Sequence, residues 1–357
     1  MTHRVIQFST GNVGREALRM IIERPDLELV GVHAASPEKQ GRDAAELCGL
    51  DAPTRVKATG NLDELLALDA DCVVFTAQAE TRPEEALVDL CALLRSGLDV
   101  VATSFVWLVN PRTADAWIVD PLTHACRFGK SSLYVNGIDP GYSGDTLALA
   151  ALSLAGTAER VVVQEVFDYA DYDDGNFTGA TFGFGANADA EPVLMALPGV
   201  VTSAWGGSVR LLAEAIGVEL DEVRDRWETW ATPTAIDCVM MRVEPGGVAA
   251  VRFAAEGIRD GVPVIVVEHV NRLTPAAAPD WPYPPPGRAG VHRVLIEGNP
   301  GIEINSHVGL GEISETHAGV VATAARVVNA IDAVRAAPPG ILGVTDLPAG
   351  YAGRVMG

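Results

Sequence analysis

The stretch "VIQFSTGNVGREAL" (residues 5–18) joins an apolar run, a turn of small residues and the start of an amphipathic segment. The spacing G-x-G-x-x-G, laid over residues 9–14, matches at Gly11 and Gly14, whereas Ser9 occupies the place of the first glycine. The order strand, turn, helix predicts the beginning of a βαβ unit, in which main-chain amides and the helix dipole can bind a pyrophosphate. The turn therefore predicts dinucleotide binding. In the alternative interpretation, the glycines only allow the chain to bend.

The first third of the chain alternates short apolar runs with helical patterns. Strands are expected at 4–8, 27–35, 71–77 and 99–103, and helices at 14–24, 43–50, 62–68 and 82–97. This alternation is typical of the α/β class. It predicts a Rossmann domain with a doubly wound parallel sheet over residues 1–137.

Residues 138–316 have a different pattern, with turns rich in glycine and proline between longer strand-like runs. Such runs cover 160–173, 235–244, 248–260, 262–273 and 291–298, with a helix-rich stretch after the first. They predict an α+β domain with a mostly antiparallel, open sheet. The proline-rich stretch 274–287 is expected to form a surface loop. A last helix, at 317–337, begins a segment (317–357) that we expect to pack back on the first domain.

Size and charge narrow the class of protein. The chain has 357 residues, 48% of them hydrophobic, which suffices for two domains with a core each. A net charge of −21 argues against nucleic acid as a partner, because it repels a phosphate backbone. Five scattered cysteines without C-x-x-C pairs indicate reduced thiols rather than disulfides or a zinc site, and we expect no metal. With no membrane-length apolar run and no signal sequence, a cytoplasmic protein is expected.

The segment after the second expected strand, "HAASPEKQGR" (33–42), bears on which nucleotide binds. A carboxylate at this place favours NAD, whereas here Ser36 is followed by Lys39 and Arg42, which can accommodate a 2′-phosphate. NADP is therefore favoured, with NAD possible; alternatively, both cations belong to a solvated loop. The candidate cofactor-binding residues are Ser9, Thr10, Gly11, Asn12, Val13, Gly14, Ser36, Lys39, Arg42, Thr76, Ala77, Thr103, Pro140 and Gly141.

Five stretches, spread over nearly the whole chain, resemble the dihydrodipicolinate-reductase-like family, and within it the branch of 2,4-diaminopentanoate dehydrogenases and native amine dehydrogenases. They are "STGNVGREALR" (9–19), "SPEKQGRDAAELCGL" (36–50), "NGIDPGYSGDTLAL" (136–149), "EGNPGIEI" (297–304) and the closing segment 317–348. The resemblance implies an NAD(P)-dependent oxidoreductase that acts on a small molecule. It also implies a Rossmann domain, a sheet domain that forms a homodimer, and a site where a C=N or C=O carbon meets the nicotinamide.

One departure from the family bears on the reaction. Where amine dehydrogenases carry a glutamate that engages the amine, after "VVAT", this chain reads "SFVWLVNP" (104–111) without an acid. We therefore expect hydride transfer to the C=O or C=N carbon of a small, fairly apolar substrate, with Phe105 and Trp107 lining the pocket. Amine dehydrogenation is the alternative, with only feeble use of ammonia expected. A non-catalytic NADP-binding sensor is a second alternative.

Two acidic stretches supply further candidates. In "GIDPGYSGDT" (137–146), Asp139 and Tyr142 are the candidate catalytic residues, Tyr142 as a proton donor. For each residue a purely structural role is the alternative: Asp139 would organise the turn, and Tyr142 would be an aromatic packing residue. In "EVFDYADYDDG" (165–175), Asp168 and Tyr169 are candidates for the substrate pocket, although strand alternation allows only one subset of these residues to face a site.

Overall fold

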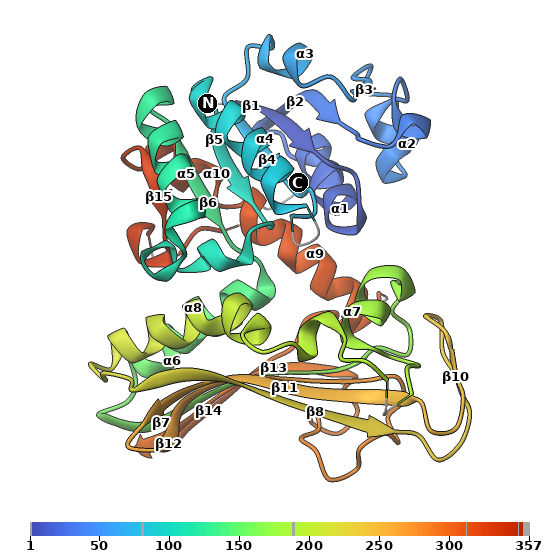
Figure 1. Ribbon diagram of the computed structural model, residues 1–357. Coiled ribbons are helices and arrows are strands. Elements are labelled where there is room, and N and C mark those ends of the chain that lie inside the picture. Colours follow the sequence, from blue (N-terminus) through green and yellow to red (C-terminus); the bar gives the residue numbers. More distant parts are fainter. Residues whose placement is uncertain (1, 80–81, 188–189, 312, 349, 353–357) are drawn as a thin grey trace. The chain divides into compact units, whose positions relative to one another are not determined.

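The computed structural model describes residues 2–79, 82–187, 190–311, 313–348 and 350–352 (Figure 1). The chain divides into two compact units. The first comprises Met1–Ile138 together with Val320–Gly357, and the second comprises Asp139–Gly319. Of the segment expected to pack back on the first domain, residues 349 and 353–357 lie outside the described residues.

The first unit is built on a parallel sheet of seven strands in the order β15-β6-β5-β4-β1-β2-β3. The strands are β1 (His3–Phe8), β2 (Leu27–His33), β3 (Ala58–Thr59), β4 (Cys72–Phe75), β5 (Asp99–Ala102), β6 (Ser132–Val135) and β15 (Gly340–Leu342). The strand order reverses between β1 and β4, and at such a switch point open α/β sheets bind ligands beyond the carboxyl ends of the strands. The predicted Rossmann fold is confirmed.

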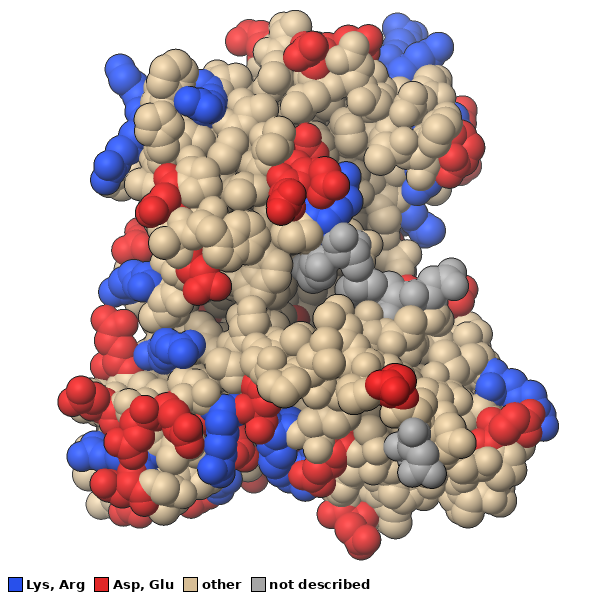
Figure 2. All heavy atoms as spheres, in the orientation of Figure 1, with Lys and Arg blue, Asp and Glu red and all other residues tan. Residues whose placement is uncertain are grey.

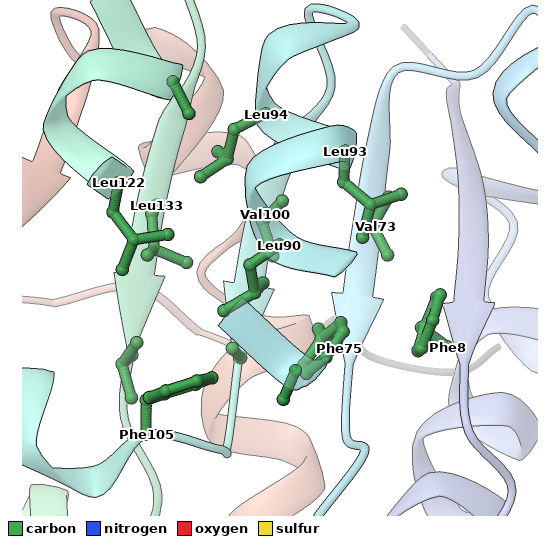
Figure 3. Close-up of a cluster of buried hydrophobic side chains, with 14 of the residues drawn as sticks. Phe8, Val73, Phe75, Leu90, Leu93, Leu94, Val100, Phe105, Leu122 and Leu133 are labelled. Atoms are coloured by element: carbon green, nitrogen blue, oxygen red, sulfur yellow. The ribbon is translucent and has the colours of Figure 1, made fainter. Parts of the chain in front are cut away.

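Helices cover both faces of this sheet (Figure 1). Strand alternation sends Ile6 and Phe8 to one face, against α4 (Pro83–Arg95) and α5 (Ala116–Gly129). Figure 3 shows this core. Val5 faces the other side, which packs against α1 (Asn12–Glu23), α9 (Glu315–Val328) and α10 (Ile331–Ala336). The short helices α2 (Ala44–Cys48) and α3 (Leu62–Leu66) complete the unit.

The second unit contains a six-stranded sheet in the order β14-β13-β7-β12-β11-β8. The strands are β7 (Thr157–Asp168), β8 (Glu222–Ala231), β11 (Val248–Arg259), β12 (Val262–Arg272), β13 (Gly290–Asn299) and β14 (Ile302–Ser306). Neighbouring strands are antiparallel except β7 and β12, so the expected mostly antiparallel sheet is confirmed. Helix α8 (Val200–Ala215) packs its apolar stripe, including Val209 and Leu212, on one face, beside α6 (Ala148–Leu152) and α7 (Ala180–Phe182).

The structure departs from the expected elements at three places. Residues 222–231, expected within a helix-rich stretch, form strand β8, because Val223 and Trp227 pack on the core while the arginines between them pair with acids of the other face. The expected strand at 235–244 is only the two-residue pair β9 (Ile236–Asp237) and β10 (Arg242–Val243). The last helix breaks between Val328 and Ile331 into α9 and α10.

The proline-rich loop 274–287 is held by one buried side chain. The guanidinium of Arg272 donates to the carbonyl oxygens of Ala277, Ala278 and Pro282, and it stacks on the ring of Tyr283 at 4.1 Å. On the face drawn in Figure 2, Lys and Arg side chains stand among Asp and Glu side chains. None of the helices in the described part of the chain is long and apolar enough to cross a membrane.

Candidate functional site

The turn after β1 has the backbone conformation that a glycine would favour. Ser9 adopts a φ of 80°, in the left-handed region, which explains how the glycine pattern is satisfied here by a small residue. Its carbonyl oxygen accepts a hydrogen bond from Nε2 of Gln7 at 2.8 Å. Thr76, at the end of β4, donates its hydroxyl to the carbonyl of Phe8 at 3.0 Å. The turn is thus fixed by two side chains of neighbouring strands.

Glycine suits the two positions of the turn, Gly11 and Gly14, for different physical reasons. A Cβ on Gly14 would lie 2.4 Å from the carbonyl oxygen of Ser9 and 2.7 Å from Oγ1 of Thr76, so only glycine allows α1 to approach β1 this closely. A Cβ on Gly11 would meet nothing within 4 Å. Gly11 is also the N-cap of α1, with no side-chain cap and no acidic residue in the first turn of the helix. Open space beside the uncapped amides of a helix start fits a pyrophosphate group.

The other predicted cofactor residues lie around the same edge of the sheet, with some exceptions. Nζ of Lys39 donates to the carbonyl of Thr10 at 3.0 Å, which brings its positive charge to the turn. Arg42 instead pairs with Glu46 on α2. Ser36 precedes the 3₁₀ turn that carries Lys39. Ala77 and Thr103 follow β4 and β5, as predicted for the carboxyl ends of these strands. Pro140 and Gly141 belong to the second unit, and their contact with a cofactor stays a prediction.

In the second unit, one row of facing residues crosses all six strands on the face that α8 covers. From β8 to β14 the register pairs Trp227, Phe253, His269, Glu165, His292 and Ser306 in turn. The Phe253 ring stacks on His269 with centroids 4.7 Å apart and on Trp227 at 5.6 Å. Glu165 accepts from Nε2 of His292 at 3.2 Å. A carboxylate and two imidazoles therefore follow the aromatic residues Trp227 and Phe253 in this row.

Asp139, a predicted catalytic residue, completes this row from the start of the unit. Its Oδ1 accepts a 2.6 Å hydrogen bond from Nε1 of Trp205, on α8, and its Oδ2 accepts from the hydroxyl of Ser143. Nε2 of His269 lies 3.3 Å from Oδ1 of Asp139, and Nδ1 of His269 lies 3.5 Å from Oε1 of Glu165. We call Asp139, Glu165 and His269 the acid–histidine cluster. Its side chains are buried, and Glu165 keeps the largest exposed fraction, 12%.

The charges of the cluster follow from this packing. Burial disfavours the charged imidazolium, but Asp139 and Glu165 outweigh burial and raise the pKa of His269 to about 10. Burial likewise favours a neutral Glu165, but His269 and His292 outweigh it and hold the pKa of Glu165 well below its usual range. His269 is therefore an imidazolium between the carboxyl groups of Asp139 and Glu165.

The same three residues offer ligand atoms within 4.8 Å of one another, a spacing that a metal ion can bridge. Metal binding needs a deprotonated imidazole nitrogen. Here both ring nitrogens of His269 face carboxylate oxygens, and the pKa of about 10 keeps the ring protonated. Without a metal ion, the distances fit a carboxylate–imidazolium–carboxylate arrangement.

The structure separates the remaining predicted site residues. Tyr169 reaches the cluster, because its hydroxyl donates to Oε1 of Glu165 at 3.3 Å. Asp168 belongs to the opposite face: strand alternation turns it away from Glu165, and its carboxylate accepts from the amide of Ala170. Phe105 has no exposed surface and lies in the core of the first unit (Figure 3), with Trp107 packed on it at 5.6 Å. Asp168 therefore points away from the cluster, whereas a place for Phe105 and Trp107 in the substrate pocket stays a prediction. Tyr142 is half-buried, and its role stays a prediction.

The sequence interpretation missed Glu165, His269, His292 and Trp205. A signal was present in "VVVQEVF" (161–167) and "VIVVEHVNRL" (264–273), where polar residues interrupt apolar strands. Such residues must be paired when they are buried. Their partners lie on strands far away in the chain, so periodicity alone does not identify them.

Comparisons with known proteins agree with this architecture. The model of the dihydrodipicolinate reductase N-terminus matches residues 5–103, and that of the 2,4-diaminopentanoate dehydrogenase C-terminal domain matches residues 199–355. An amine dehydrogenase of Streptomyces virginiae is 40% identical over 345 residues, which cover 96% of this chain and 95% of that protein.

Solved structures share the fold. The amine dehydrogenase of Mycobacterium smegmatis has a TM-score of 0.76 at 18% identity, with 99% of this chain and 98% of that one covered. GenD2 from gentamicin A biosynthesis, in complex with NAD, has a TM-score of 0.51 at 16% identity over 92% and 86% of the two chains. Biliverdin reductase from Synechocystis, with NADP+, has a TM-score of 0.51 at 13% identity over 93% and 89%.

The dinucleotide turn, the Rossmann sheet and a full-length relative at 40% identity lead to one conclusion. The chain belongs to the family of NAD(P)-dependent oxidoreductases that contains the amine dehydrogenase of Streptomyces virginiae.

Proposed function

We propose that the protein is an amine dehydrogenase, which interconverts a small primary amine with the corresponding carbonyl compound and ammonia. The observation that carries this proposal is the geometry of the acid–histidine cluster, in which two carboxyl groups flank one imidazole ring among aromatic side chains. Such a site favours a substrate with an ammonium group and an apolar carbon skeleton. The full-length similarity to an amine dehydrogenase supports the same assignment and reverses our initial order of the two reactions.

In the proposed oxidation, the amine loses a hydride and a proton, and water then replaces nitrogen to release ammonium. The nicotinamide, when bound, supplies the hydride acceptor. Because the pKa of Glu165 is held well below its usual range, this carboxylate stays ionised and stabilises a cation. His269 stays protonated and prevents the two carboxylates from repelling each other. The cluster therefore binds and orients the amine, and Asp139 and Tyr142 stay the candidates for handling the proton.

The test is the ammonia dependence of turnover. With NADPH or NADH and a small ketone, we expect oxidation of the nucleotide only when ammonium is present, and reduction of NAD(P)+ by the matching amine. A charge-assisted hydrogen bond contributes about 1.5–3 kcal/mol, so Glu165→Gln should raise KM for the amine by about 10- to 150-fold. Asp168→Asn, on the opposite face of the sheet, is the matched control and should leave KM unchanged.

Reduction of a ketone or a preformed imine without ammonia is the second candidate. It is favoured by the apolar, fully buried Phe105 in the segment where amine dehydrogenases carry the amine-binding glutamate. Ketone reduction that is equally fast with and without ammonium would decide for this candidate.

We also propose NADP as the preferred nucleotide, since Lys39 holds a positive charge at the turn and the end of β2 carries no carboxylate.

The first unit would bind the dinucleotide, and the second would bind the substrate and join two copies in a homodimer. Light scattering should give twice the chain mass. All five cysteines are free, which suits the cytoplasm.

A further inference from the structure

Asn271 is a buried polar residue without a hydrogen-bond partner among the described residues, two positions along β12 from His269 of the acid–histidine cluster. Its side chain has no exposed surface, and neither its carbonyl oxygen nor its amide nitrogen has a hydrogen-bond partner among the described residues. Residues two apart on a strand point to the same face, so Asn271 lies on the face of His269, the face that α8 covers.

The neighbours of Asn271 on its own row cannot satisfy it. The register places Val251 of β11 on one side and Phe167 of β7 on the other, and both side chains are apolar. Beyond Phe167 stands Gly290 of β13. The Phe167 ring leans over this glycine, since a Cβ on Gly290 would lie 2.1 Å from Cε1 of the ring. The Phe167 ring therefore lies over Gly290 and offers the carboxamide of Asn271 no polar partner.

A carboxamide at this position is unfavourable for folding alone. A buried donor and acceptor without partners lose their hydrogen bonds to water, whereas a valine or leucine of similar size would pack well in a strand. Buried polar groups that lack a partner in the protein are explained by water or by a ligand. The position of Asn271 favours a ligand over water, because the carboxamide adjoins the charged cluster that binds the amine in the proposed function.

We propose that Asn271 is a specificity-determining residue that hydrogen-bonds a second polar group of the substrate. This inference rests on the proposed function. Two residues along a strand span about 6.6 Å, the reach of about four to five bonds. The substrate class is thus a small primary amine with a hydroxyl or carbonyl oxygen about that many bonds from its nitrogen. The carboxamide can donate to such an oxygen and accept from a hydroxyl.

The experiment compares 4-aminopentan-1-ol with 2-aminohexane, which differ only by a hydroxyl in place of a terminal methyl. The wild-type enzyme should prefer the amino alcohol in kcat/KM by about tenfold or more. Asn271→Leu should abolish this preference by lowering kcat/KM for 4-aminopentan-1-ol much more than kcat/KM for 2-aminohexane. Asn305→Leu, on an exposed position of β14, is the control and should keep the preference. Asn271→Val gives a second variant should the leucine disturb folding.

Thermal unfolding gives a readout that is independent of turnover. Without substrate, Asn271→Leu should be at least as stable as the wild type, and 4-aminopentan-1-ol should raise the Tm of the wild type but not of the variant. An unchanged preference, an equal loss for both amines, or a lower Tm for Asn271→Leu and Asn271→Val would overturn the inference and assign the carboxamide a structural role. If no amine is oxidised, the proposed function fails, and the ligand-dependent Tm decides on Asn271 separately.

Discussion

Replacing His269 by glutamine should destabilise the second unit strongly. The variant leaves Asp139 and Glu165 buried on either side of a neutral side chain, where the imidazolium had stood 3.3 and 3.5 Å from their oxygens. Removing one partner of a buried ion pair costs about 3–5 kcal/mol. For a folding unit of this size, 1 kcal/mol corresponds to about 2–4 °C, so the Tm should fall by about 6–20 °C.

The pH dependence gives the same magnitude by another route. The pKa of His269 rises from an ordinary 6.5 to about 10 on folding, and each pKa unit corresponds to about 1.4 kcal/mol, hence about 5 kcal/mol in total. This is the same interaction, not an additional one. Because the pKa of His269 is higher in the folded state than in the unfolded state, its protonation contributes fully to the free energy of unfolding below about pH 6.5. This contribution declines as the pH rises and is lost above about pH 10.

Thermal unfolding followed by circular dichroism at pH 6.5, 8 and 10 tests this reasoning. The wild type should lose stability over this range, whereas His269→Gln should start lower and change less. His124→Gln, on an exposed position of α5, is the control and should follow the wild type. Glu165→Gln combined with His269→Gln should recover part of the loss, because only one buried carboxylate remains unpaired. A His269→Gln protein within about 2 °C of the wild type at pH 6.5, or with the wild-type pH profile, would refute the assigned charges.

Four further substitutions have defined outcomes. Gly14→Ala should lower both the Tm and the affinity for NADPH, since its Cβ would lie 2.4 Å from the carbonyl oxygen of Ser9, whereas Gly11→Ala should lower the affinity alone. Fluorescence titration measures the affinity, and thermal unfolding measures the Tm. An unaffected affinity in both variants would exclude this turn as the binding site of the nucleotide. Lys39→Ala should reduce kcat/KM for NADPH but not for NADH; an unchanged ratio would remove Lys39 from nucleotide recognition. Gly290→Ala should cost about 1–3 kcal/mol, because its Cβ would overlap the Phe167 ring, and an unchanged Tm would contradict this packing.

The first unit was predictable because its signals are local. Short apolar runs, helical periodicity and the spacing of Gly11 and Gly14 lie within a few residues of each other, and together they determine the strand–turn–helix order of a Rossmann sheet. Even the serine at position 9 was compatible with this interpretation, since a small residue can adopt the left-handed conformation that the turn requires. Strand β8 was missed because its arginines and acids conceal the alternation when their cross-strand partners are unknown.

The class of fold, the expectation of a nucleotide-binding turn and the resemblance to a family all follow from the amino-acid sequence, as do the site candidates Asp139 and Tyr169. Glu165 and His269 come together only on folding, since their strands lie far apart in the chain and meet through the parallel pairing of β7 and β12. The structure also turned Asp168 away from Glu165, because residues an odd number of positions apart on a strand point to opposite faces. The carboxylates of Asp139 and Glu165, which raise the pKa of His269 against the opposing effect of its burial, reach the ring through these long-range contacts alone.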